Sequence, residues 1–127
     1  HMGYIVTINL MQISEQSEEK IILMTKLVKK IGPDVLYFAD SLGAMDPSQI
    51  SNLIKTFRKN WKGPLGIHTH NNLGKAVANS VAAINLGVNW IDSTIAGMGR
   101  GPGNAQTEYL LIELQNIEKR ELNILPL

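Results

Sequence analysis

Short β-rich apolar segments alternate along the chain with longer segments whose apolar residues recur at helical spacing. The short segments cover residues 4–10, 34–40, 65–70 and 88–96. Their near-continuous hydrophobicity is typical of parallel strands that are buried on both faces. The alternation predicts an α/β fold of four βα units, in which the strands pair in parallel through right-handed crossovers.

The segment 18–32 is the first predicted helix. Its apolar residues recur at three- and four-residue steps, and Gly32-Pro33 is expected to end it. The stripe expected to face the core consists of Ile22, Leu23, Leu27, Val28 and Ile31.

The second helix has the clearest start signal. Asp46 is the expected N-cap, Pro47 the first helical residue and Gln49 the reciprocal partner of a capping box. The apolar stripe predicted for this helix consists of Ile50, Leu53, Ile54 and Phe57.

Two further helices are expected in the second half of the chain. The third runs from about Leu73 or Gly74 to Gly87, and its small residues allow close packing on a sheet. The fourth is expected to begin near Asn104. The small residues of the third helix are Ala76, Ala78, Ala82 and Ala83, and the apolar residues of the fourth are Tyr109, Leu110, Leu114 and Ile117.

The number of βα units limits the possible architectures. A complete (β/α)₈ barrel needs about 250 residues, and this chain has 127. A small doubly wound, flavodoxin-like sheet is the alternative, although such sheets usually carry about five strands. Asp-Ser closes a predicted strand at 40–41 and again at 92–93, a weak repeat that is expected of successive βα units.

Composition excludes several classes of function. The net charge is +1, with 44% hydrophobic and 18% charged residues, so no basic patch indicates a nucleic-acid partner. Cysteine is absent, which excludes disulfides and thiolate metal sites. With no apolar run of about 18–20 residues and no signal peptide, we expect no membrane association and a cytoplasmic location. His1-Met2 is interpreted as a cloning remnant, which leaves 3–127 as the domain.

The segment 66–74, GIHTHNNLG, holds both of the histidines outside that remnant. On a strand, positions i and i+2 point to the same face about 7 Å apart, so His68 and His70 should project together. Two neutral imidazoles suit a divalent transition metal, but a protein site usually needs three or more ligands. The alternative is that both side chains form hydrogen bonds in a polar loop.

The segment 96–104, AGMGRGPGN, contains four glycines directly after a predicted strand. Such a segment can turn sharply and approach a ligand closely. It lacks a Walker or dinucleotide fingerprint, so a phosphate-binding loop and an ordinary tight loop both remain open.

Taken together, HTHNNLGKAVANSVAAINLGVNWIDSTIAGMGRGPGNAQTE and ADSLGAM resemble the metal-dependent aldolase and acyl-CoA lyase superfamily. The resemblance covers nearly the whole chain from Gly3, and the 4-hydroxy-2-oxovalerate aldolase branch is the most similar one. Hydroxymethylglutaryl-CoA lyase belongs to the same superfamily. The resemblance implies a TIM (β/α)₈ barrel, of which this chain would supply strands four to seven as a partial domain.

The same resemblance implies a metal site. His68 and His70 match the two histidine ligands, and Asn104 matches an asparagine ligand of the lyase branch. Asn104 has a competing role as N-cap of the last predicted helix. Ser41 matches a position beside the bound keto acid, although Asp40-Ser41 can equally serve loop hydrogen bonding.

The implied chemistry is reversible carbon–carbon cleavage beside a carbonyl, in which Mn²⁺, Mg²⁺ or Zn²⁺ stabilises a pyruvate enolate. The substrate would be a small 2-oxo acid or an acyl-CoA. The metal carboxylate, the steadying arginine and the general base of the family lie in N-terminal strands that have no counterpart here.

Two hypotheses follow from these patterns. The chain is a fragment of a metal-dependent aldolase or lyase, inactive by itself, whose partner is the remainder of its own barrel. Alternatively, it is a non-catalytic module, either a self-associating half-barrel or a small-molecule or phosphate-binding unit. Four open parallel strands would leave edges with unpaired backbone groups, which a second copy could cover. A homo-oligomer is therefore also expected.

Overall fold

The computed structural model describes residues 3–118, so His1-Met2 and the chain after Glu118 lie outside the described residues. Strands and helices alternate from one end of this range to the other, as predicted. They are β1 (Thr7–Leu10), α1 (Glu18–Ile31), β2 (Val35–Asp40), α2 (Pro47–Asn60), β3 (Leu65–Thr69), α3 (Ala76–Asn85), β4 (Trp90–Ile91) and α4 (Thr107–Glu118), with short 3₁₀ turns η1 (Ile13–Glu15) and η2 (Ile95–Gly97).

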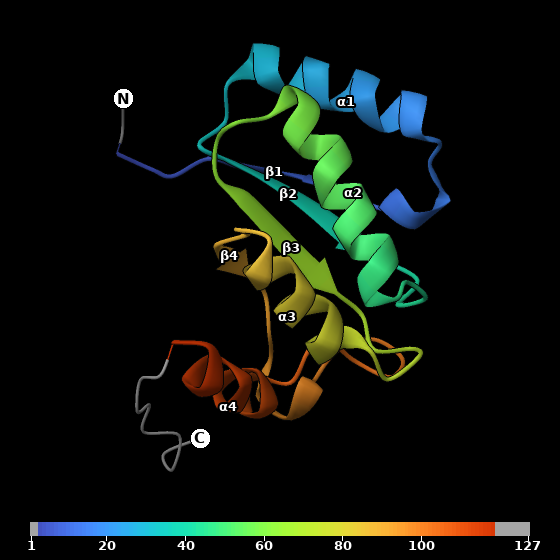
Figure 1. Cartoon of the computed structure of the whole chain (residues 1–127), viewed down its shortest axis with the longest axis vertical. Coiled ribbons are helices and arrows are strands. Elements are labelled where there is room, and N and C mark those ends of the chain that lie inside the picture. Colours follow the sequence, from blue (N-terminus) through green and yellow to red (C-terminus); the bar gives the residue numbers. More distant parts are fainter. Residues whose placement is uncertain (1–2, 119–127) are drawn as a thin grey trace.

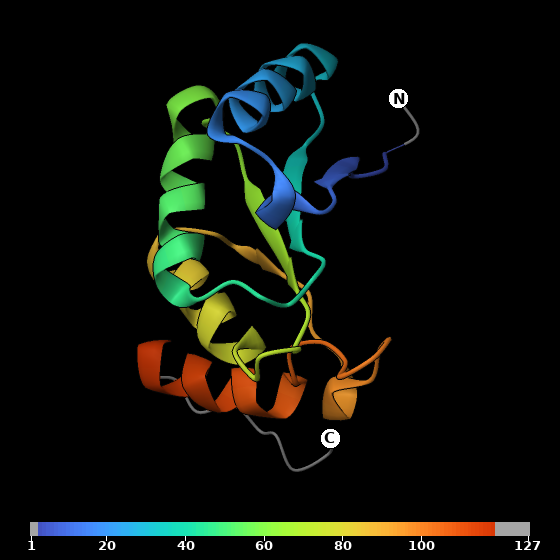
Figure 2. The same cartoon turned by 90° about the vertical axis from the view of Figure 1, so that its right-hand side faces the viewer.

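The four strands form one parallel sheet in the order β1-β2-β3-β4. Each helix packs against the next one along the chain, and Figure 1 shows this succession beside the sheet. Figure 2 shows α2 and α3 together on one side of the strands. A doubly wound sheet reverses its strand order and carries helices on both faces. The unreversed order with helices on one side is instead the arrangement of part of a (β/α)₈ barrel.

The main core lies between β2, β3 and α2. The rings of Phe38 and Phe57 stack with centroids 5.1 Å apart at 27°, and full burial of a Phe side chain is worth about 1.5–3 kcal/mol. The predicted start of α2 is confirmed, because Asp46 and Gln49 form both hydrogen bonds of a capping box. The predicted stripe is confirmed as well, since each of its members is buried: Ile50, Leu53, Ile54 and Phe57.

The predicted core stripe of α1 is wrong for most of its residues. The side chains that face the core are Ile21, Thr25 and Val28, and of the predicted stripe only Val28 is buried. The helix end is as predicted, because Gly32 adopts a left-handed conformation and donates its amide to the Val28 carbonyl. Helical periodicity could not separate the two faces, since α1 is apolar on both of them. The exposed apolar side chains on the other side are Leu23, Leu27 and Ile31.

The burial of β1 and of α3 differs from what the sequence predicts. β1 alternates between exposed and half-buried residues instead of being buried on both faces, because it is the edge strand of the described sheet. The buried face of α3 combines Ala76 and Ala83 with the polar Asn79 and Ser80, whereas Ala78 is exposed.

The predicted fourth strand is shorter than expected, and the fourth helix begins later than expected. β4 spans only Trp90–Ile91, because the segment 104–106 enters between the end of β3 and the chain that follows β4. In that segment the Ala105 amide donates to the Thr69 carbonyl at 3.2 Å, and the Ala105 carbonyl accepts from the Thr94 amide at 3.0 Å. α4 therefore begins at Thr107, and Asn104 is not its N-cap.

Between residues 3 and 118, no helix is both long and apolar enough to cross a membrane.

Candidate functional site

His68 and His70 lie at the carboxyl end of β3, where the sequence predicts that they project together. Their ring centroids are 5.0 Å apart, and the ring planes meet at 79°. Thr69 points to the opposite face, where its hydroxyl lies 3.2 Å from both the Ala76 carbonyl and the Ser80 hydroxyl. Strand alternation and a buried anchor on the helix side therefore hold the two imidazoles on the other face of the sheet.

The carboxylate of Asp92 forms a hydrogen bond with His68. Asp92 directly follows β4, the strand that pairs with β3. Asp92 Oδ2 lies 3.1 Å from His68 Nδ1, and the Asp92 amide donates to the Ile67 carbonyl of β3. A carboxylate can only accept a hydrogen bond, so Nδ1 is the donor, and in the neutral ring the lone pair is on Nε2. Asp92 is not among the site residues predicted from the sequence, although the repeated Asp-Ser at 92–93 was the available signal.

The pKa of the His70 imidazole is shifted by burial and by neighbouring charges. Burial lowers the pKa of the His70 imidazole, as do His68 and Arg100, whereas a hydrogen bond to the Gly103 backbone and the charge of Asp40 act in the opposite direction. The net lowering favours the neutral imidazole, whose lone pair can bind a cation.

The inserted segment 104–106 brings Asn104 beside His70. The two residues form an isolated antiparallel bridge, and Asn104 Nδ2 donates to the Met98 carbonyl at 3.1 Å. Asn104 Oδ1 is buried and is one of the side-chain oxygens without a hydrogen-bond partner among the described residues. A buried amide oxygen that lacks a donor is unfavourable unless another group contacts it, so this atom is available to a ligand.

Ser41 and Asp40 follow β2 at the same edge of the sheet. The Asp40 carboxylate is fully buried and accepts from the amides of Ala44 and Met45 at 3.3 and 3.1 Å. Ser41 Oγ accepts from the Gln12 amide at 2.9 Å. Both side chains therefore take part in loop hydrogen bonding, and the assignment of Ser41 to substrate binding stays a prediction.

The loops after β2 and β3 and the glycine-rich segment are joined to one another. The Asn71 amide donates to the Gly103 carbonyl at 2.9 Å, and the Leu73 amide donates to the Gly43 carbonyl at 3.1 Å. Asn72 Nδ2 donates to the Leu42 carbonyl. These three connections join the loops of the carboxyl edge to one another, and Ala76 of α3 also donates its amide to Asn71 Oδ1 at 3.0 Å.

The glycine-rich segment closes on itself. The amides of Gly97, Met98, Gly103 and Asn104 all donate to carbonyls between residues 94 and 100. Gly103 has φ +84, and a Cβ there would lie 1.8 Å from the Gly97 carbonyl oxygen, so only glycine allows this approach. With these four amides engaged, the arrangement favours the tight-loop interpretation over a phosphate cradle.

Donor chemistry decides whether this edge suits a metal ion. Within the described range, no group of three or more His, Cys, Asp or Glu side chains could hold one. His68, His70 and the unpartnered Asn104 Oδ1 make up a mixed set of two nitrogens and one oxygen, which suits a divalent ion such as Zn²⁺ or Mn²⁺. The residues fit a metal as an incomplete set, to which water or a further protein ligand would have to be added.

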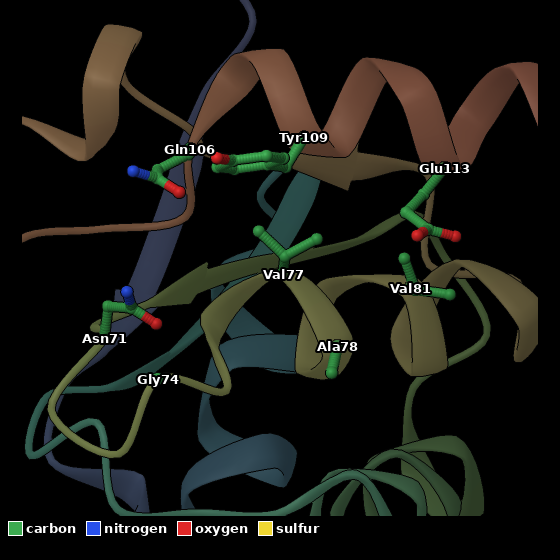
Figure 3. Close-up of a pocket in the computed structure, with 8 residues that line it drawn as sticks. All are labelled: Asn71, Gly74, Val77, Ala78, Val81, Gln106, Tyr109 and Glu113. Carbon is green, nitrogen blue, oxygen red and sulfur yellow. The ribbon is translucent and has the colours of Figure 1, made fainter.

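A separate pocket of about 530 Å³ lies between α3 and α4, behind the carboxyl edge (Figure 3). Asn71 and Gln106 lie at one end of it, Val77 of α3 faces Tyr109 of α4, and Val81 faces Glu113. Neither His68 nor His70 lines this pocket. The histidine edge is the better candidate for chemistry, because two imidazoles lie together there and Asn104 lies opposite His70, whereas the pocket walls contributed by α3 are aliphatic or small.

The sequence profile of the HMGL-like family matches residues 2–124. A 4-hydroxy-2-oxovalerate aldolase of Carboxydothermus hydrogenoformans is 40% identical over 99 residues, which are 78% of this chain and 30% of that protein. The enzyme of the same name from Pelotomaculum thermopropionicum is 40% identical over 114 residues, or 90% of this chain and 34% of its own length. The chain thus spans about a third of the curated relatives that it matches.

Solved structures show the same partial coverage. The N-terminal domain of a proposed aldolase from Bacteroides vulgatus superposes with a TM-score of 0.87 at 37% identity, over 96% of this chain and 41% of that one. Hydroxymethylglutaryl-CoA lyase of Bacillus subtilis superposes with a TM-score of 0.81 at 23% identity, over 88% of this chain and 42% of the lyase chain. The prediction of a partial TIM barrel is confirmed.

Proposed function

Because the chain belongs to the HMGL-like family, we propose that it forms part of a divalent-metal-dependent aldolase or lyase. The reaction we propose for the whole enzyme is cleavage or formation of a carbon–carbon bond beside a 2-oxo acid, as the name of the matching aldolases suggests. Two observations support the proposal: His68 and His70 lie together at the end of β3, and a backbone bridge places Asn104, with its unpartnered side-chain oxygen, opposite His70.

Each of these residues has a distinct role in the proposal. His68, held through Nδ1 by Asp92, presents Nε2, and His70 is favoured in its neutral form. Asn104 supplies the amide oxygen. A bound Mn²⁺, Mg²⁺ or Zn²⁺ would supply Lewis-acid polarisation of the substrate carbonyl. Ser41 lies at the neighbouring strand end, where the substrate carboxylate or acyl group would be placed.

The described residues do not complete the catalytic machinery. Asp40 is committed to two loop amides, and Asp92 is committed to His68, so neither carboxylate is free to act as a general base. We therefore propose that a further ligand and the base come from the remainder of the barrel, and that this chain alone turns over no substrate. The proposed substrate is a small 2-oxo acid or acyl-CoA, handled in the cytoplasm.

Calorimetric titration with Mn²⁺ and with Zn²⁺ tests the metal site directly. The wild-type chain should bind either ion more tightly than His68→Ala, His70→Ala or the double variant. Asn104→Ala should weaken binding less, because one neutral oxygen donor is lost from the set. Asn89→Ala is the matched control, since Asn89 is exposed at the opposite end of β3.

The double variant also serves as the baseline. It retains His1, so any binding by the N-terminal segment is common to both proteins. Equal affinity of the wild type and the double variant for both ions would overturn the proposed metal site.

Self-association is a second candidate, favoured by the apolar side chains left exposed beside β1 and on α1. We name the set Tyr4, Ile5, Val6, Leu23, Leu27 and Ile31 the open face. Soluble monomers rarely expose many large apolar side chains together, and an open sheet edge is a pairing surface. A second copy, or the remaining strands of the barrel, would cover the open face.

Sedimentation velocity over a range of concentrations separates these outcomes. A dimer that dissociates on Leu27→Glu supports self-association through the open face. A monomer at all concentrations contradicts it and leaves the rest of the barrel as the expected cover.

A further inference from the structure

Gly66 of β3 allows a tyrosine from the neighbouring strand to lie across its backbone. Tyr37 of β2 is the register partner of Gly66, and Gly66 in turn pairs with Trp90 of β4. A Cβ added at Gly66 would lie 2.4 Å from the nearest atoms of the Tyr37 ring. Side chains seldom come that close, so the absence of a Cβ is what permits the ring to lie over β3.

Tyr37 lies close enough to Asp92 for that carboxylate to act on its hydroxyl group. Tyr37 is only 8% exposed, and burial raises the pKa of its hydroxyl to about 12, with the charge of Asp92 and a hydrogen bond to it acting in the same direction. A protonated phenol can donate, and a carboxylate has room to accept from two donors. Asp92 Oδ2 therefore accepts from His68 Nδ1 at 3.1 Å, and the same carboxylate can also accept from the Tyr37 hydroxyl.

We propose that Tyr37 and Asp92, placed by Gly66, are positioning residues that hold His68 with its proton on Nδ1 and its Nε2 lone pair directed at the carboxyl edge. The inference rests on the proposed function for the use of that lone pair, but the hydrogen-bonded arrangement is independent of it. A histidine that binds a metal commonly donates its other nitrogen to a carboxylate, which sets its tautomer and orientation. Here the carboxylate is itself oriented by a buried phenol.

The alternative is that Asp92 and Tyr37 are packed together without directing His68. Side-chain exposure keeps that alternative open to test, because Asp92 is 46% exposed and His68 is 24% exposed, so water could replace either partner. A simple packing role predicts no effect on the position of the imidazole proton.

The decisive measurement is ¹⁵N NMR of the imidazoles in the metal-free protein. The chain has only three histidines, and His68→Ala identifies the signals of His68. In the wild type we expect the neutral His68 ring to carry its proton on Nδ1. Asp92→Ala should move the proton population toward Nε2, and Tyr37→Phe and Gly66→Ala should produce smaller shifts in the same direction.

Tyr4→Phe is the matched control for Tyr37→Phe, because Tyr4 is 73% exposed and far along the chain from this arrangement. Tyr37→Phe preserves the ring and removes only the hydroxyl, so it is expected to fold even if Asp92→Ala does not. A wild-type His68 protonated on Nε2 would overturn the proposal. So would a tautomer unchanged in Asp92→Ala or, if that variant does not fold, unchanged in both Tyr37→Phe and Gly66→Ala.

Titration with Zn²⁺ alone gives a second readout. Loss of the carboxylate in Asp92→Ala should weaken binding about 10- to 100-fold, the usual effect of removing a partner that orients a ligand. Tyr37→Phe should weaken it less than tenfold. If the wild type binds no Zn²⁺, the proposed function loses its support, while the NMR result still decides the arrangement of His68. If Zn²⁺ binds equally to wild type and Asp92→Ala, the positioning role is wrong and the metal site stands.

Discussion

The carboxyl edge around His68 and the open face beside β1 differ in whether their side chains have partners within the chain. At the carboxyl edge, the loops after β2 and β3 and the glycine-rich segment exchange hydrogen bonds with one another, and even the buried Asp40 carboxylate has two amide donors. At the open face, large apolar side chains such as Ile5 and Ile31 are more than half exposed, at 62% and 70%.

This difference distinguishes polar contacts that form within the chain from apolar surface that only further strands or another molecule could bury. Many polar groups at the carboxyl edge have hydrogen-bond partners within the described residues, because unpaired buried donors and acceptors are costly, whereas Asn104 Oδ1 has none there. Apolar groups at the open face have no local cover, and their burial would require further strands or another molecule. The edge that holds the histidines is therefore built largely from hydrogen bonds within this chain.

The largest expected contrast lies between the two sides of α1. Ile21→Ala should reduce the free energy of unfolding by about 2–5 kcal/mol, because it opens a cavity in the core. Leu27→Ala should change it by no more than about 0.5 kcal/mol, because Leu27 is exposed on the open face. Urea unfolding of both variants measures the contrast. A loss at Leu27 as large as that at Ile21 would show that the open face is covered in solution.

A smaller contrast is expected between two aspartates that both accept backbone amides. Asp40→Ala leaves the buried Met45 amide and the partly buried Ala44 amide without their acceptor and should cost about 3 kcal/mol. Asp34→Ala removes the 2.7 Å bond from the exposed Val6 amide, which water can replace, and should cost about 1 kcal/mol. Chemical denaturation monitored by circular dichroism compares them. Equal costs would mean that the carboxyl edge is no better formed than the open side.

The smallest effect is expected for the ion pair that joins α1 to α2. Glu18 and Lys59 lie 2.7 Å apart, and a hydrogen bond and the charge from Lys59 lower the pKa of Glu18 below its usual 4.5. A carboxyl group with a lowered pKa adds stability above its unfolded-state pKa and loses it as the pH falls through the folded value. Lys59→Ala should thus lower the melting temperature slightly at pH 7 and not at all below the folded-state pKa of Glu18.

Salt provides the control for that prediction. Both side chains are largely exposed, so the small difference at pH 7 should shrink further at high ionic strength. A difference that persists in strong acid or in 1 M salt would assign the effect of Lys59 to packing of its aliphatic stem.

Signals within a few residues determined much of the fold. Asp46, Pro47 and Gln49 define the start of α2, because capping depends on atoms three residues apart, and Gly32 ends α1 for a similar reason. The common direction of His68 and His70 also follows from the sequence, since strand alternation is a property of the backbone.

Contacts between distant segments decided the rest. Asp92 reaches His68 across 24 residues, and Asn104 reaches His70 only because the segment 104–106 enters between β3 and the chain after β4. The core-facing side of α1 was equally hidden, since both of its sides are apolar and only packing on the sheet selects one. Local periodicity therefore specified the elements and the histidine pair, whereas the partners of that pair depend on long-range packing, which no local pattern encodes.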